Sequence, residues 1–108
     1  MKWIVETLNH TIDTELDQLP PDMRARFIHI SRLIEEFGLE RVREPHVKHL
    51  QGPLCEMRLT GRDGISGALY VTATGRRVIV VRVFIKKTQK TPVAEIELAL
   101  RRAKEVQK

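Results

Sequence analysis

The sequence predicts an α+β fold in which helices pack on a small, mostly antiparallel sheet of about four strands, in the order β-α-α-β-β-β-α. Two patterns along the chain predict it. Within residues 23–37 apolar side chains recur at steps of three and four, as on one helix face, whereas from residue 54 they recur at every second position, as in a strand. A chain of 108 residues can build one core, so we expect a single domain over residues 1–108.

The N-terminal elements are expected to be one strand and a helical hairpin. Residues 2–8 are rich in β-branched and aromatic side chains, which favour a short strand. A first helix is predicted over residues 12–19 and ends at two consecutive prolines. A second helix is predicted over residues 23–37, before Gly38, a residue suited to a left-handed helix C-terminus. The apolar stripe of this helix consists of Met23, Phe27, Ile30, Ile34 and Phe37.

Three strands and a last helix are expected in the second half of the chain. The strands cover residues 54–60, 65–73 and 78–85, separated by glycine-containing turns. The third strand is apolar on both faces, which favours a central position in the sheet. The last helix is expected over residues 92–106, and the segment before residue 54 is expected to be a loop. The side chains expected on one face of the third strand are Ile79, Val81, Val83 and Ile85.

Positive charge is concentrated in the segment that is predicted to form the sheet. The chain has a formal net charge of +5 and a pI near 9.8, which favours an anionic partner. Residues 45–91 hold 9 of the 19 basic residues and only 2 of the 14 acidic ones. The anionic partner is therefore expected on the sheet and its turns.

The cysteine content and the N-terminus indicate the compartment. A single cysteine excludes an internal disulfide and fits a reducing environment. The N-terminus has no signal-peptide core, and no apolar run has the length of a membrane span. We therefore expect a cytoplasmic protein with no membrane partner.

The run over residues 84–92 combines basic side chains with the start of the last helix. It reads Phe-Ile-Lys-Lys-Thr-Gln-Lys-Thr-Pro, and proline is favoured at the first helical position. Thr91 is expected to cap the helix by accepting a hydrogen bond from a first-turn amide. Free amides and the positive end of the helix dipole would then lie beside Lys86, Lys87 and Lys90, a site suited to a phosphate or carboxylate.

Two arginines on predicted strands extend this basic region. Arg58 shares a strand face with Glu56, and Arg82 lies on the strand that leads to the lysines. On a curved sheet these arginines could meet on one surface that binds phosphates and stabilises the charge that develops when RNA is cleaved. The alternative is a solvated sheet face on which Arg58 pairs with Glu56, and both interpretations stay open.

Candidates for proton transfer come just before the first strand of the sheet hairpin. Cleaving RNA without a metal needs an acceptor for the 2′-hydroxyl proton and a donor for the leaving oxygen. His46, Lys48 and His49 are the candidates, and loop histidines with no special role are the alternative. The His46-x-x-His49 pair lacks the cysteine or acidic partner of a usual metal site, so no metal and no other cofactor are expected.

Several other side chains have both a structural and a functional interpretation. Cys55 alternates onto the apolar strand face, which favours a core position over a nucleophile. Tyr70 and Phe84 could stack on bases, although core packing is favoured for both. The arginines of the long helix form either a solvated face or a contact with rRNA or a partner: Arg24, Arg26 and Arg32.

The motifs that carry a family resemblance are Val47-Lys48-His49-Leu50, Leu54-x-Glu56-Met57-Arg58, Gly64-Ile65, Ala68-Leu69-Tyr70 and Lys86-Lys87-Thr88-Gln89-Lys90-Thr91-Pro92-x-x-Glu95-Ile96. Together they resemble the RelE/ParE toxin superfamily, and more narrowly its phage-derived, HigB-like branch. The similarity runs from the opening strand to the last helix. The Lys-Lys-Thr-Gln-Lys-Thr-Pro run is specific to that branch.

The resemblance implies a RelE-like fold and a toxin of a type II toxin–antitoxin system, a ribosome-dependent mRNA endoribonuclease that inhibits translation. It implies a helix-turn-helix antitoxin, the ribosome and mRNA as partners, and no small-molecule cofactor. By position, Arg58 and Lys86 or Lys87 inherit catalytic cationic roles, and Lys48 a phosphate-contacting or proton-transfer role. The expected RNA- or phosphate-binding residues are Arg62, Arg76, Arg82, Lys90 and Thr91.

This chain departs from the family pattern near one surface. After Gly64-Ile65 the family usually has an aromatic or small residue followed by arginine, but this chain has Ser66 followed by Gly67. Removing a preorganised charge of that kind costs on the order of 10²–10³ in rate. Cys55 replaces a common aromatic residue, and Pro92-Val93-Ala94 lacks the usual basic residue. These departures favour a weakened copy. The alternatives are an inactive module that binds RNA or the antitoxin, and a ParE-like inhibitor of gyrase.

Overall fold

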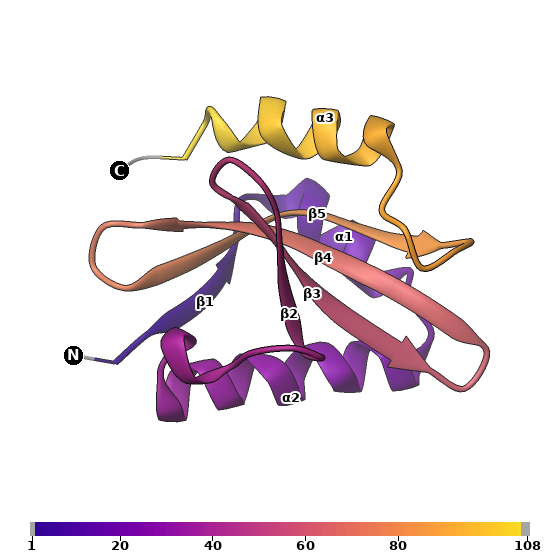
Figure 1. Cartoon of the computed structure of the whole chain (residues 1–108), viewed down its shortest axis with the longest axis horizontal. Coiled ribbons are helices and arrows are strands. Elements are labelled where there is room, and N and C mark those ends of the chain that lie inside the picture. Colours follow the sequence, from indigo (N-terminus) through magenta and orange to yellow (C-terminus); the bar gives the residue numbers. More distant parts are fainter. Residues whose placement is uncertain (1, 107–108) are drawn as a thin grey trace.

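The structure is a computed structural model that describes residues 2–106 (Figure 1). Its elements are β1 (Ile4–Thr7), α1 (His10–Asp17), α2 (Pro21–Phe37), a 3₁₀ turn (Leu39–Arg41), β2 (Val47–Gln51), β3 (Leu54–Gly61), β4 (Gly64–Ala73), β5 (Arg77–Lys86) and α3 (Val93–Ala103). The predicted α+β class is confirmed, with the order β-α-α-β-β-β-β-α. Within residues 2–106 no helix combines the length and the apolar character needed to cross a membrane.

The strands form one five-stranded sheet in the order β1-β5-β4-β3-β2. β1 runs parallel to β5, and all other neighbours are antiparallel. The ten-residue strands β4 and β5 lie inside the sheet, while the short strands β1 and β2 form its edges. The central position predicted for β5 is therefore confirmed.

β2 is an addition to what the sequence predicted, which was a loop before residue 54 and one strand fewer. Lys48 pairs with Glu56 and His49 with Cys55, and the register shifts between His49 and Gln51. Lys48, His49 and Gln51 are all exposed on this edge strand. Because its polar side chains face water, β2 lacks the apolar alternation by which half-buried strands are recognised.

Helices cover both faces of the sheet (Figure 1). α1 and α2 pack on one face, the hairpin face, where Ile12, Ile30 and Met57 are fully buried. α3 packs on the other face, the α3 face, where Leu54 and Ala99 are fully buried. Figure 1 shows the sheet as the middle layer between α3 above it and α2 below it.

A bulge in β5 changes which of its residues share a face. Val80 and Arg82 pair with consecutive residues of β4, which leaves Val81 without an opposite residue. Val81 packs in the core of the α3 face, whereas Val83 joins the core of the hairpin face. The single face expected through residues 79–85 is therefore wrong, and the bulge is the reason.

Candidate functional site

The α3 face carries charged residues at the end that leads to the C-terminus of β5. Residues directly opposite each other on neighbouring strands share a face. Lys48 lies opposite Glu56, and Arg58 lies opposite Gly67. Lys86 ends β5 at this same end of the sheet, where it pairs with Ile65 near the start of β4. We call Lys48, Glu56, Arg58, Lys86 and the loop of residues 87–91 the basic end.

Glu56 is the centre of the basic end. It is 1% exposed, and its two carboxylate oxygens have different partners. Lys86 Nζ lies 3.0 Å from Oε1, and Thr91 Oγ1 donates to Oε2 at 2.7 Å. Lys86 Nζ also donates to the carbonyl oxygen of Gln89 at 2.9 Å. A buried carboxylate is tolerated when it is paired and hydrogen-bonded in this way.

The start of α3 differs from the one that the sequence predicted. Thr91 is 7% exposed, and its hydroxyl donates a hydrogen bond to Glu56, so its side chain does not cap the helix. Pro92 occupies the N-cap position with no side-chain cap, and the helix begins at Val93. The predicted threonine cap is wrong because the buried carboxylate binds the Thr91 hydroxyl. The predicted place of Pro92, the first helical residue, is wrong by one position.

Lys86 is also not the exposed cation that was expected. Its side chain is 2% exposed and its charge is compensated by Glu56. The local pairing of Arg58 with Glu56, one of the two interpretations left open, is wrong as well. Arg58 instead donates from its guanidinium to the side-chain oxygen of Gln89. Lys86 and Arg58 therefore both contact Gln89, one through its carbonyl and the other through its side chain.

The cations that face solvent at the basic end are Lys48, Lys87 and Lys90, all exposed, together with the half-buried Arg58. Lys87 and Lys90 lie on the loop between β5 and α3, and Lys48 lies on the edge strand β2. These side chains come from three separate segments of the chain. Their arrangement suits a polyanion that passes along the end of the sheet.

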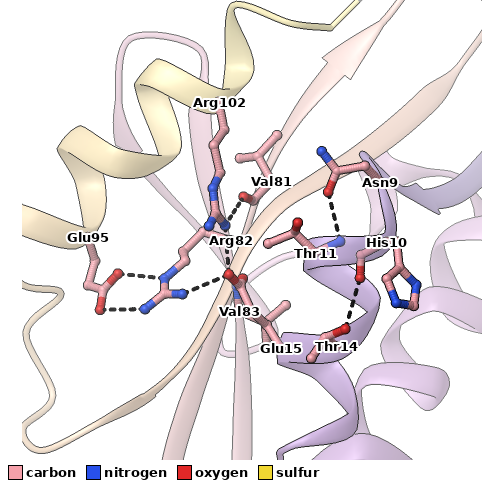
Figure 2. A network of polar contacts seen from close by, with 10 residues as sticks. All are labelled: Asn9, His10, Thr11, Thr14, Glu15, Val81, Arg82, Val83, Glu95 and Arg102. Carbon is pink, nitrogen blue, oxygen red and sulfur yellow. Dashed lines mark hydrogen bonds and ion pairs between the residues drawn. The ribbon is translucent and has the colours of Figure 1, made fainter.

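Arg82 belongs to a network of ion pairs that joins β5 to two helices (Figure 2). Its guanidinium binds Glu95 of α3 through two bonds of 2.7 and 3.1 Å and lies 2.9 Å from Glu15 of α1. Glu15 also pairs with Arg102 at 2.8 Å and accepts the Val83 N–H at 3.0 Å. The hydrogen bonds to Glu95 raise the pKa of Arg82. The expectation that Arg82 binds phosphate is not supported, because two carboxylates already compensate its charge.

The two turn arginines lie at opposite ends of the sheet. Arg62 is exposed in the turn between β3 and β4, at the end that holds Lys86. Its backbone N–H donates to Asp22 Oδ2 at 2.6 Å, a contact that lowers the pKa of Asp22. Arg76 lies in the turn between β4 and β5 with a φ of 57°. The length of β5, roughly 30 Å, separates Arg76 from Lys86, so Arg76 lies outside the basic end.

Neither candidate histidine lies on the α3 face. His49 is opposite Cys55, and its Nε2 lies 2.9 Å from the carbonyl oxygen of Gly52. The His46 ring packs edge-on against His29 of α2, with centroids 6.3 Å apart. Of the three proton-transfer candidates, Lys48 alone shares a face with Glu56. No group of three or more His, Cys, Asp or Glu side chains within residues 2–106 could hold a metal ion.

The core interpretations of Cys55 and Tyr70 are confirmed. Tyr70 is 2% exposed in the core of the hairpin face, and Cys55 packs against that core. Burial raises the pKa of the Cys55 thiol and of the Tyr70 hydroxyl. Phe84 is also buried, on the α3 face, with the Arg82 guanidinium 5.8 Å from its ring centre. Neither aromatic ring is exposed enough to stack on a base.

Glu56, Gln89 and Gly67 are the parts of the site whose contacts were not foreseen. Glu56 shares its strand with Arg58, so a local pair was the simplest interpretation of the sequence. Its actual partner, Lys86, is 30 residues away in the sequence. This pair can be inferred only when the register of β3, β4 and β5 is known. The signal in the sequence is that Glu56 alternates onto the same strand face as the apolar Leu54. A carboxylate that is buried on such a face needs a cation, and the strand register identifies that cation as Lys86.

The geometry defines a class: an α+β protein with a five-stranded sheet and a cationic end organised around one buried carboxylate. The chain belongs to the family described as Phage derived protein Gp49-like (DUF891), whose match covers residues 14–104. That range includes every residue of the basic end. A comparison with curated proteins finds no match.

Proposed function

We propose that this protein is the toxin of a type II toxin–antitoxin system, a HigB-like endoribonuclease that cuts mRNA on the ribosome in the cytoplasm. The whole chain would form one toxin domain. Membership of the Gp49-like family and the resemblance of the motifs support this assignment. The observation that carries it is the basic end, where Arg58 contacts Gln89 of the loop that bears the exposed Lys87 and Lys90, while Lys86 already neutralises the Glu56 carboxylate.

The proposed chemistry is electrostatic. The 2′-oxygen of a ribose attacks the adjacent phosphorus, the bond to the 5′-oxygen breaks, and a cyclic phosphate forms. One proton leaves the 2′-hydroxyl and one reaches the 5′-oxygen. Lys87 and Lys90 would bind phosphates on either side, and Arg58 would stabilise the negative charge on the pentacovalent phosphorus. Lys48 would assist proton transfer or bind a further phosphate.

The proposed protein partner is a helix-turn-helix antitoxin, as the toxin family implies. The catalytic role given to Lys86 moves to Lys87, because Lys86 is buried against Glu56. Thr91 and Arg82 likewise become structural residues, and Arg62 remains a phosphate contact at the same end of the sheet. The proposal thus keeps Arg58, Lys48, Lys87, Lys90 and Arg62 as RNA-contacting residues.

A second candidate function is an inactive module that retains RNA binding. Gly67 favours it, since this position carries no side chain opposite Arg58 and the neighbouring carboxylate of Glu56 fills the space. The basic end would then bind RNA without the full set of cations that cleavage requires.

The test is a reconstituted cleavage reaction. Purified protein is added to 70S ribosomes that hold an mRNA with an empty A site, and 5′ ends are mapped by primer extension. We expect cuts within the A-site codon and no cuts in the same mRNA without ribosomes. Binding to ribosomes without cuts would support the inactive module. Accumulation of gyrase–DNA cleavage complexes in a parallel reaction would support the ParE-like alternative and contradict the ribosomal one.

A further inference from the structure

We propose that Glu56, Lys86 and Thr91 form a clamp that holds the basic loop of residues 87–90 in its RNA-binding shape, and that glycine at position 67 makes the clamp possible. The RNA-binding part of this inference rests on the proposed function. The order of the loop does not, and it can be measured without RNA.

The clamp closes the loop through one carboxylate. Lys86 immediately precedes the loop in the chain, and Thr91 immediately follows it. Each binds a different oxygen of Glu56, at 3.0 and 2.7 Å respectively. Lys86 Nζ also binds the Gln89 carbonyl oxygen at 2.9 Å, so the middle of the loop is tied to the same ammonium group. The side chains of Lys86 and Glu56 are 2% and 1% exposed. In such a site each hydrogen bond is protected from water, and a missing partner is costly.

Gly67 provides the space for the clamp. A Cβ atom built at this position would lie 2.7 Å from Glu56 Oε2 and 3.4 Å from Phe84 Cε1. The first distance is shorter than real Cβ contacts, so a side chain at position 67 requires the carboxylate to move. Oε2 is the oxygen that accepts the Thr91 hydroxyl proton, so the Thr91 bond is the one that such a movement breaks.

Backbone conformation does not explain this glycine. Gly64 and Gly75 have φ values of 152° and 89°, which side chains rarely adopt, whereas Gly67 is not among the positive-φ residues. Gly67 lies within a regular stretch of β4, opposite Arg58 and Phe84. Space is therefore the reason for glycine here. The departure that the sequence presents as a lost arginine has a structural use in this chain.

The first experiment measures loop order by ¹⁵N relaxation of the full chain. Thr91→Val removes one hydroxyl from the clamp, and Gly67→Ala displaces the carboxylate. We expect both variants to lower the order parameters of residues 87–90 toward about 0.6, the range of flexible backbone, while the rest of β4 and β5 stays unchanged. Thr72→Val is the matched control, since Thr72 is an exposed threonine of β4. Unchanged order parameters in both clamp variants would overturn the clamp.

The second experiment measures binding to mRNA-programmed 70S ribosomes. Gly67→Ala and Thr91→Val are each expected to weaken binding about tenfold, as the loss of a hydrogen bond to a charged group does. The double variant should be no weaker than either single variant, because both remove the same contact. A loss in the double variant equal to the product of the single losses would overturn the coupling. Absence of ribosome binding by the unmodified chain would instead contradict the proposed function.

Discussion

At the scale of single residues, neighbours in the sequence have opposite roles at the basic end. Lys86 is buried and paired with Glu56, whereas Lys87 is exposed. Both belong to one basic run, and the sequence predicted similar roles for them. Strand alternation separates them, but the partner that decides the role of Lys86 comes from β3. Sequence reasoning could therefore locate the basic run but could not tell its buried lysine from its exposed one.

Lys86 and Lys87 are predicted to differ sharply in their effect on stability. Lys86→Met leaves the Glu56 carboxylate buried without its cation, and we expect a loss of about 3 kcal/mol in the free energy of unfolding. Lys87→Met, the matched control at an exposed position, should change it by less than about 0.5 kcal/mol. Urea denaturation monitored by circular dichroism measures both. Equal losses in the two variants would show that Lys86 is not held by Glu56 in solution.

The half-buried Cys55 and the buried Tyr70 predict that the protein loses stability at alkaline pH. The pKa values of both groups are raised in the folded state, mainly by burial. Their protonated forms are favoured by folding, so this stability is fully present below the unfolded pKa values and is lost as pH rises above about 9. Urea midpoints between pH 7 and 10.5 should fall, and less steeply in Tyr70→Phe than in the unmodified chain. Identical slopes in the two proteins would exclude Tyr70 as a cause.

At the scale of elements, the sequence predicted those with a strong apolar period and missed the one without it. The long helix, the three strands after residue 54 and the last helix all have such a period and are all present. β2 pairs with β3, but its side chains at Lys48, His49 and Gln51 are exposed. Its sequence therefore has no apolar alternation that would predict a strand. The bulge at Val81 was invisible for another reason, since it concerns how β5 aligns with β4.

The network around Arg82 is predicted to stabilise the packing of α1 and α3 on β5. Arg82→Met leaves Glu15 and Glu95 close together without their shared cation, and we expect a loss of about 2 kcal/mol, below that of a fully buried pair. Adding Glu95→Gln removes one of the two repelling charges, so the double variant should be more stable than Arg82→Met alone. Thermal and urea unfolding of the four proteins completes the cycle. Strictly additive effects would contradict the network.

At the scale of the whole molecule, the net charge overstates the charge available to a partner. Residues 45–91 hold 9 of the 19 basic residues, but several are compensated internally. Arg77 pairs with Glu6 at 3.1 Å, Arg82 with Glu15 and Glu95, and Lys86 with Glu56. What faces solvent near the end of the sheet is a smaller set: Lys48, Arg62, Lys87 and Lys90, with Arg58 half-buried.

This distribution predicts how salt affects RNA binding. Each phosphate contact to a single strand contributes about 0.7 to the slope of log affinity against log salt concentration. Lys87→Gln combined with Lys90→Gln should therefore reduce the slope for a single-stranded RNA by about 1.4. Arg76→Gln, at the far end of β5, should leave the slope unchanged. Fluorescence anisotropy across a salt series measures it, and an equal reduction by Arg76→Gln would contradict the location of the site.

The central claim is that Arg58 at the basic end stabilises the transition state of mRNA cleavage on the ribosome. The most direct measurement compares the unmodified chain, Arg58→Gln and Arg101→Gln in the ribosome cleavage reaction, at saturating protein. Arg101 is exposed on α3 and serves as the matched control. We expect Arg58→Gln to cut on the order of 10² times more slowly and Arg101→Gln to cut at the unmodified rate. Cleavage by Arg58→Gln at the unmodified rate would contradict the claim.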